Sequence, residues 1–219
     1  MDSTVVEVVL ANRSFLYALA ARGFAEEPDC AFLDMIASEQ ARQQVCLLDD
    51  ELTEALASQL ESCAELACTD GALVDVRHEY VRMFIGPGAP EVAPYETVFL
   101  TGKPMLFQPG ALEVREAYRT AGFEPAECRS VPDDFVGIEF DFMAKLACEA
   151  SRAWSMGDVA KAQGYLAESL GFLDGHVLGW VPEFAERLAE AHGDCFYTWF
   201  SLFAAQVAQR DRRAISQLI

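Results

Sequence analysis

The chain of 219 residues is 52% hydrophobic and 23% charged, which is typical of a folded soluble domain and excludes an intrinsically disordered protein. Its 35 acidic and 16 basic residues give a formal net charge of −19, and positions 1–70 hold 14 acidic but only 3 basic residues. This balance argues against nucleic acid, whose phosphates need clustered Lys and Arg, and favours a basic peptide as partner unless the acid serves solubility alone.

Apolar residues recur at helical spacing along the first third of the chain. They predict a helix over residues 3–22, which Gly23 would end, because glycine readily adopts the left-handed conformation at a helix C-terminus. A second helix is predicted over residues 28–36 and a third from residue 49 to about 66.

The stretch from residue 70 to Tyr95 is the one around which the rest is organised. A fourth helix, 70–84 with Asp70 as its N-cap, would bring five apolar residues onto one face: Leu73, Val76, Tyr80, Met83 and Phe84. Gly86-Pro87-Gly88 would end it, and a proline-spaced loop containing Pro94 would follow. A stiff loop beside an apolar helix face forms a groove that binds with little loss of entropy. The alternative is a buried helix followed by an ordinary connection.

The second half of the chain is predicted to be helical as well, apart from the segment 97–107, which Gly102 and Pro104 make irregular. Asp194 would cap the last helix, whose first turns are apolar all round and therefore buried. The predicted helices cover residues 111–121, 132–156, 158–173, 175–193 and 195 onward. The sequence thus predicts an all-α fold with one domain over 1–219, a bundle of about eight to eleven helices with a Gly/Pro-rich loop after the fourth.

Two carboxylates, Asp133 and Asp134, fall at the start of the predicted helix 132–156, where they would cap free N–H groups and complement the helix dipole. Alternatively they bind a cationic partner. Glu139, about one turn further along, could then join Asp134 in a small acidic site for a guanidinium group.

The chain offers no recognisable catalytic or metal motif. His78-Glu79 begins like the zinc-protease signature, but Arg82 stands where its second histidine should be, and no P-loop or nucleophile elbow is present. His176 and His192 are interpreted as surface or helix-end residues. We therefore expect no enzyme activity, no metal and no cofactor.

The seven cysteines form no C-x-x-C pair, so neither a disulfide framework nor a zinc site is indicated. The N-terminus carries acid where a secretory signal needs positive charge, and no apolar run reaches the roughly 18 residues of a membrane span. These features predict a cytoplasmic protein without stable membrane insertion.

At this point the residues resemble a known family. E-Y-x-R-x-F-x-G-P at 79–87 and P-Y-E-T-V at 94–98 are similar to the central motif of the TorD/DmsD family of redox-enzyme maturation chaperones. VREAYRTAGF at 114–123, PDDFVGIEFDFM at 132–143, and HVLGWVPEFAERL and CFYTWF near the C-terminus resemble successive blocks of that family. The similarity spans most of the chain.

The resemblance implies a cytoplasmic, all-helical chaperone that binds the twin-arginine leader of a molybdoenzyme catalytic subunit and holds it until cofactor insertion and export. Seven positions match residues implicated in leader binding: Tyr80, Met83, Phe84, Pro94, Tyr95, Pro132 and Asp134. Phe135 departs from the pattern, because many members have histidine there, and this change makes the site more apolar.

Our hypothesis is that Tyr80, Phe84 and Tyr95 hold the apolar part of the leader while Asp134, with Glu139, meets its arginines. The runner-up is a nitrate-reductase-type assembly chaperone, whose molybdoenzyme is not exported. An all-helical enzyme or a scaffold without a groove are further alternatives. The chain could be a monomer or a dimer that exchanges segments.

Overall fold

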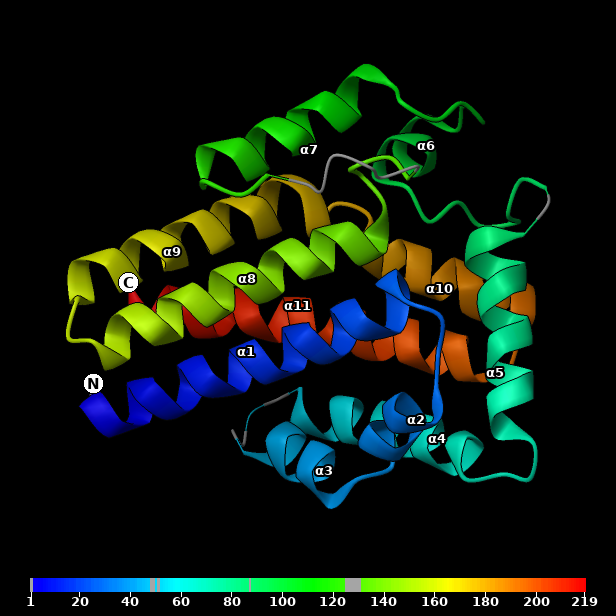
Figure 1. The fold of residues 1–219 in the computed structure, drawn as a ribbon, viewed down its shortest axis with the longest axis horizontal. Coiled ribbons are helices and arrows are strands. Elements are labelled where there is room, and N and C mark those ends of the chain that lie inside the picture. The colour runs from blue at the N-terminus through cyan, green and yellow to red at the C-terminus, as the bar shows by residue number, and fades with distance from the viewer. Residues whose placement is uncertain (1, 48–49, 51, 87, 125–130) are drawn as a thin grey trace.

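The computed structural model describes residues 2–47, 50, 52–86, 88–124 and 131–219, and these ranges form helices without any β-strand (Figure 1). The predicted all-α fold is confirmed. The elements are α1 (Ser3–Ala25), α2 (Cys30–Ile36), α3 (Glu39–Cys46), α4 (Thr53–Ala67), α5 (Ala72–Tyr80), the π-helical turn η1 (Val81–Ile85), α6 (Glu96–Thr101), α7 (Pro109–Thr120), α8 (Val136–Ser155), α9 (Val159–Phe172), the π-helical turn η2 (Leu173–Val177), α10 (Val181–His192) and α11 (Phe196–Leu218).

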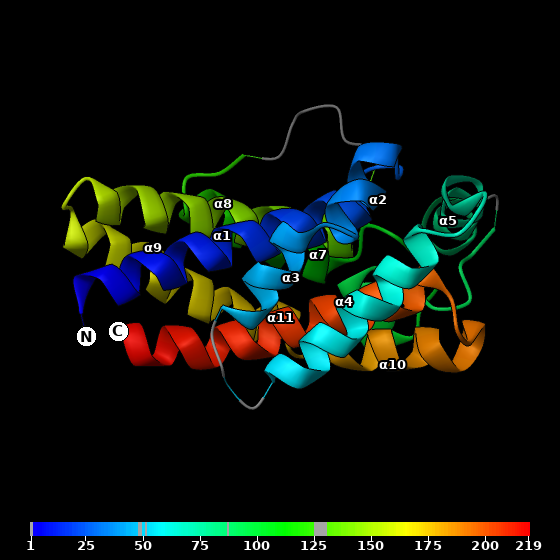
Figure 2. The same ribbon diagram turned by 90° about the horizontal axis from the view of Figure 1, so that it is seen from below.

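Long helices run side by side along the molecule: α1 packs on α8, α8 on α9, and α11 on α4 and α10 (Figures 1 and 2). The short helices α2 and α3 pack against α4, and α5 stands across one end of the bundle. The N- and C-terminal ends lie close together at the opposite end in both views.

Aromatic side chains fill the centre of the bundle. The first turns of α11, predicted to be buried, place Phe196, Tyr197, Phe200 and Phe203 at 0–1% exposure. Each such side chain contributes about 1.5–3 kcal/mol through burial. The other large, fully buried aromatic residues are Tyr17, Phe24, Phe140, Trp180 and Phe184. A buried ion pair between Arg13 and Asp211 adds a specific polar link between α1 and α11.

Gly23 does not end the first helix, contrary to the prediction. Helix α1 continues to Ala25, and Gly23 lies buried inside it. A Cβ atom at this position would overlap the ring of Phe200 and come within 2.9 Å of Phe32 Cζ. The glycine is therefore needed for close packing of α1 against α11 and α2, not for a turn.

Helix α3, with Ser38 as its N-cap, was not predicted, and it makes the Gly/Pro-rich loop follow the fifth α-helix instead of the fourth. Pro87 of that loop, and Asp49 at the predicted start of the third helix, lie outside the described residues. The segment 97–107 is not wholly irregular, because its first residues belong to α6, which ends at Gly102 with φ 65°.

Two predicted caps are wrong. Helix α5 has Gly71 at its N-cap, with φ 82°, in place of Asp70. At α11 the backbone N–H of Tyr197 donates to Glu79 Oε2 at 3.0 Å, whereas Asp194 accepts a hydrogen bond from the Trp199 indole. The carboxylate at the start of α11 therefore comes from α5, 118 positions away in the chain.

One helix among the described residues, α1, is long and apolar enough to span a membrane by length and composition, with a mean hydropathy of 1.3. Of that apolar window, 56% is buried inside the structure. Packing against α8 and α11 thus accounts for its hydrophobic residues.

We expect Gly23→Ala to destabilise the protein by about 2 kcal/mol, because the ring of Phe200 is enclosed by other aromatic side chains and cannot move aside. Gly164→Ala is the matched control: it lies inside α9 with open space around it, and should stabilise by roughly 0.5–1 kcal/mol. Urea unfolding followed by circular dichroism measures both. Equal effects of the two substitutions would contradict the packing role of Gly23.

Candidate functional site

A pocket of about 490 Å³ opens between the C-terminal end of α1, the end of α5 with η1, and the start of α8; we call it the α1–α8 pocket. Most of its lining residues are apolar or aromatic, but polar atoms make up nearly half of the wall, and two acidic side chains, Glu26 and Asp141, lie among them. The lining residues are Ala25, Glu26, Tyr80, Phe84, Ile85, Tyr95, Val131, Phe135, Ile138 and Asp141. An apolar pocket with a few acidic groups suits a ligand that is both apolar and cationic.

The π-helical turn η1 sets the side of the pocket formed by Phe84 and Ile85. It ends where the N–H of Gly86 donates to the carbonyl of Val81 at 2.6 Å, so the turn holds one residue more than an α-helical turn. Phe84 is 6% exposed, whereas Ile85 is 61% exposed. The turn therefore buries one apolar side chain in the wall and presents the next to solvent at the pocket.

A short antiparallel bridge between Tyr95 and Phe135 forms the facing wall. The N–H of Glu96 donates to the carbonyl of Asp134, and the N–H of Val136 to that of Pro94, both at 2.9 Å. The rings of Tyr95 and Phe135 lie 5.5 Å apart, and Phe135 contacts Phe84 edge to face at 6.5 Å. The wall is continuous with the aromatic core.

Asp133 and Asp134 do not cap α8, contrary to the prediction. Asp134 Oδ2 accepts hydrogen bonds from the backbone N–H of Thr97, at 3.0 Å, and from its hydroxyl, so it caps α6. Asp133 pairs with Arg115 at 2.6 Å. Helix α8 begins after Phe135 without a side-chain cap. These carboxylates hold the loop before α6 and the helix α7 against the start of α8.

Glu139 is completely buried, and its Oε2 accepts a hydrogen bond from the Trp180 indole at 3.1 Å. Burial raises the pKa of Glu139 well above its ordinary value, and the nearby Glu96 carboxylate raises it further. Burial also raises the pKa of Glu96, which is opposed by His176 at 3.1 Å. His176 and His192 lie in the last turns of η2 and α10, which confirms the predicted helix-end positions. The His176 side chain is only 19% exposed, and its ring packs on Phe172.

The structure brings three of the eight predicted site residues to the pocket: Tyr80, Phe84 and Tyr95. Five others are buried and do not line it: Met83, Pro94, Pro132, Asp134 and Glu139. The pattern missed Glu26, Ile85, Ile138 and Asp141. Helical spacing from Phe135 to Ile138 and Asp141 was the signal that could have found the last two.

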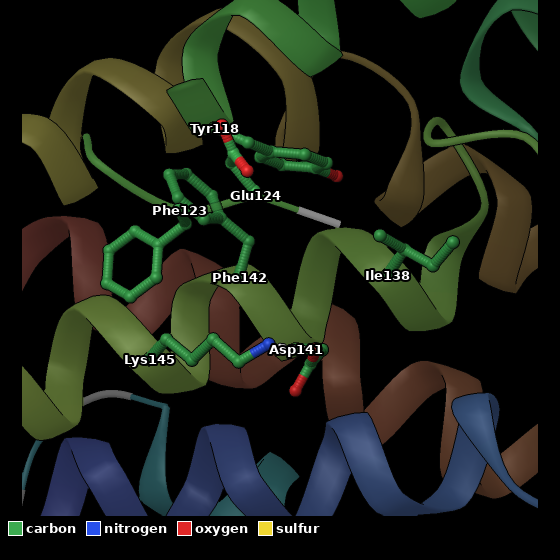
Figure 3. Close-up of a pocket in the computed structure, with 7 residues that line it drawn as sticks. All are labelled: Tyr118, Phe123, Glu124, Ile138, Asp141, Phe142 and Lys145. Atoms are coloured by element: carbon green, nitrogen blue, oxygen red, sulfur yellow. Dashed lines mark hydrogen bonds and ion pairs between the residues drawn. The ribbon is translucent and has the colours of Figure 1, made fainter. Parts of the chain in front are cut away.

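A smaller pocket of about 20 Å³ continues along α8 and shares Ile138 and Asp141 with the α1–α8 pocket (Figure 3). Phe123 packs edge to face on Phe142 there, with ring centroids 5.6 Å apart. Lys145 Nζ points toward Asp141 and donates to its Oδ2 at 2.6 Å. The Asp141 carboxylate is therefore paired with a cation within the fold.

Within the part of the chain that the structure describes, no group of three or more His, Cys, Asp or Glu side chains could hold a metal ion.

Comparison with known proteins links the chain to one family. The family described as "Nitrate reductase delta subunit" matches residues 47–186, more than half of the chain. A protein named Chaperone protein TorD from Vibrio cholerae is 24% identical over 86% of this chain and 79% of its own length. Proteins of the same name from Aliivibrio salmonicida and Shewanella pealeana are 21% and 24% identical over 91% and 90% of this chain, and over 93% and 88% of their own lengths.

The raised pKa of Glu139 predicts how stability depends on pH. The folded protein keeps a proton on Glu139 that the unfolded chain releases above about pH 4.3. The contribution of Glu139 to the free energy of unfolding is therefore complete below that pH, and it is lost as the pH rises toward the folded-state pKa. Glu139→Gln cannot titrate and still accepts from Trp180. Its free energy of unfolding should therefore fall less steeply than that of wild type between about pH 5 and about pH 8.

Urea unfolding across this pH range measures the difference, with Glu65→Gln at an exposed position of α4 as the matched control. Equal slopes for wild type and Glu139→Gln would show that Glu139 is already ionised in the folded protein.

Proposed function

This chain belongs to the family described as the nitrate reductase delta subunit, the TorD/DmsD family of redox-enzyme maturation chaperones, and from this premise we propose that it binds the twin-arginine leader of a molybdoenzyme subunit. The observation that carries the proposal is the α1–α8 pocket, with its aromatic walls and its two acidic side chains. A twin-arginine leader combines an apolar stretch with two adjacent guanidinium groups, and this pocket complements both.

In this proposal the apolar stretch lies against Tyr80, Phe84, Ile85 and Tyr95. Phe135, where many family members have histidine, contributes a further aromatic ring packed on Tyr95 instead of a titratable group. We expect the pocket to prefer a strongly apolar leader segment for this reason. The π-helical turn η1 and the bridge between Tyr95 and Phe135 are already formed, so little conformational entropy is lost there on binding.

The guanidinium groups are assigned to Glu26 and Asp141, not to Asp134 and Glu139 as the sequence suggested. Asp134 and Glu139 are 1% and 0% exposed, so an incoming guanidinium group cannot reach them. The Glu26 side chain is 65% exposed and that of Asp141 33%, and the leader's arginines would replace their present partners Arg22 and Lys145. Asp134 then supports binding indirectly, by holding the wall formed by Tyr95 and Phe135.

The chaperone would hold the precursor in the cytoplasm until its cofactor is inserted. Residues 1–219 would act as one domain, either as a monomer or as a dimer with exchanged segments. The net charge of −19 favours encounter with a cationic leader, and added salt should weaken binding without abolishing it. The protein would bind and release its client without catalysing a reaction.

An assembly chaperone for a molybdoenzyme that stays in the cytoplasm is the alternative, and the family description favours it to the extent that it names nitrate reductase. The two readings differ in the client's N-terminal segment. Binding to a segment without an arginine pair, as tight as to one with the pair, would favour the alternative.

Ile85→Ser should weaken leader binding about tenfold, because it removes an exposed apolar side chain from the pocket without disturbing the core. Val74→Ser is the matched control, since Val74 is 55% exposed on α5 and lies outside the α1–α8 pocket. Calorimetric titration with a leader peptide measures both. Equal affinity of the two variants would remove Ile85 from the site.

The double variant Glu26→Gln, Asp141→Asn should weaken binding of a leader with two arginines by about tenfold or more, because charge-assisted hydrogen bonds are lost. The same variant should bind a leader with two glutamines in those positions as wild type does. The four affinities form a double-mutant cycle. Additive effects of the protein and peptide changes would show that these carboxylates do not contact the arginines.

A further inference from the structure

A second pocket, of about 290 Å³, lies between α1 and α2; we call it the α1–α2 pocket. It is apolar apart from Arg22 and Asp29, which lie together at one end of it. The lining residues are Phe15, Ala18, Leu19, Arg22, Asp29, Ala31, Phe32 and Met35. Neither the predicted motifs nor the proposed function uses this pocket.

The two pockets share one face of α1. From α1, the α1–α2 pocket is lined by Phe15, Ala18, Leu19 and Arg22, and one wall of the α1–α8 pocket is lined by Ala25 and Glu26. These positions follow one another at intervals of three and four, which places them on one stripe of the helix. The stripe from residue 15 to residue 26 is about 16 Å long. The pockets therefore lie end to end along α1.

Ion pairs occupy the junction between the pockets. Arg22 pairs with Glu26 at 3.2 Å and with Asp29 at 3.1 Å, and its guanidinium lies 5.6 Å from the ring centroid of Phe32. The Glu26 and Asp29 side chains are 65% and 50% exposed, whereas that of Arg22 is 27% exposed. Glu27, 57% exposed, adds a third carboxylate and pairs at 3.1 Å with Arg77, which is 43% exposed. The junction thus holds three carboxylates against two guanidinium groups, and the carboxylates are the more exposed to solvent.

We infer that the α1–α2 pocket is a second apolar subsite for the same polypeptide that occupies the α1–α8 pocket, with the cationic residues of that polypeptide lying over the carboxylates between the two. This inference rests on the proposed function. Continuity along α1 and the charge of the junction both point to one chain with an arginine pair between two apolar segments. A second copy of this protein is disfavoured, because each copy carries a net charge of −19.

The geometry sets the length of the ligand. An extended chain spans the stripe of about 16 Å in about five residues, and a helical one in about eleven. A peptide that ends at its arginine pair can therefore fill only one pocket. Apolar residues on both sides of the pair should be required for full affinity.

The test uses two fluorescent leader peptides: a long one with apolar residues on both sides of the arginine pair, and a short one that keeps only the apolar stretch held by the α1–α8 pocket. Ala18→Trp fills the α1–α2 pocket from an exposed position on α1. It should weaken binding of the long peptide about tenfold, to the affinity of the short one, and leave the short peptide unaffected.

Ala160→Trp, at an exposed position of α9, is the matched control and should change neither affinity. Ala31→Trp fills the same pocket from α2, so the test stands even if Ala18→Trp does not fold. A benzophenone placed beyond the arginine pair of the long peptide should crosslink to Met35, which lines this pocket.

The outcomes separate the two proposals. If wild type binds both peptides equally, or if tryptophan at position 18 or 31 leaves the long peptide unaffected, the second subsite is overturned while the α1–α8 pocket stands. If neither peptide binds wild type, the proposed function itself fails. A small apolar molecule that fills the α1–α2 pocket without displacing the long peptide would also overturn the inference.

Discussion

The close approach of α1 and α8 at Gly137 is the contact on which the binding surface depends. A Cβ atom at Gly137 would lie 2.8 Å from the backbone nitrogen of Ala25, so the two helices touch with only a hydrogen atom between them. As a result Ala25 lines the same pocket as Phe135 and Ile138, although it is far from both in the sequence. A larger residue at this point would move the end of α1 away from the aromatic wall.

Buried or half-buried carboxylates hold the parts of this surface that lack regular packing. Asp134 caps α6 and fixes the bridge between Tyr95 and Phe135, while Glu79 caps α11 from the helix that leads into the π-helical turn. Glu139 lies behind the same wall, bonded to Trp180. Burying such groups is costly unless they are paired, so they specify one arrangement more than they add stability. The exposed carboxylates of Glu26 and Asp141 instead form surface ion pairs with Arg22 and Lys145.

In the proposed chaperone, buried acidic side chains support the fold and exposed acidic side chains are assigned to binding. Aromatic rings continuous with the core keep the apolar walls rigid, and carboxylates at the end of α1 supply attraction for a cationic segment. The excess of acid in positions 1–70, visible in the composition, includes Glu26, Glu27 and Asp29 at the junction of the two pockets. In the proposed function, this surface would bind a leader segment without changing its own fold.

The sequence by itself determined the all-α fold, most helix positions, the burial of α11 and the family, because helical periodicity and short motifs are local properties. Only the tertiary structure decided which carboxylates face the pocket, since periodicity identifies a buried face but not what packs on it. Gly23 was predicted to be a helix stop, yet it serves close packing with Phe200. Asp134 was predicted to cap α8, yet it caps a helix 37 residues earlier in the chain. In both cases the local sequence is compatible with either role, and a contact with a residue that is distant in the sequence determines which role the residue has.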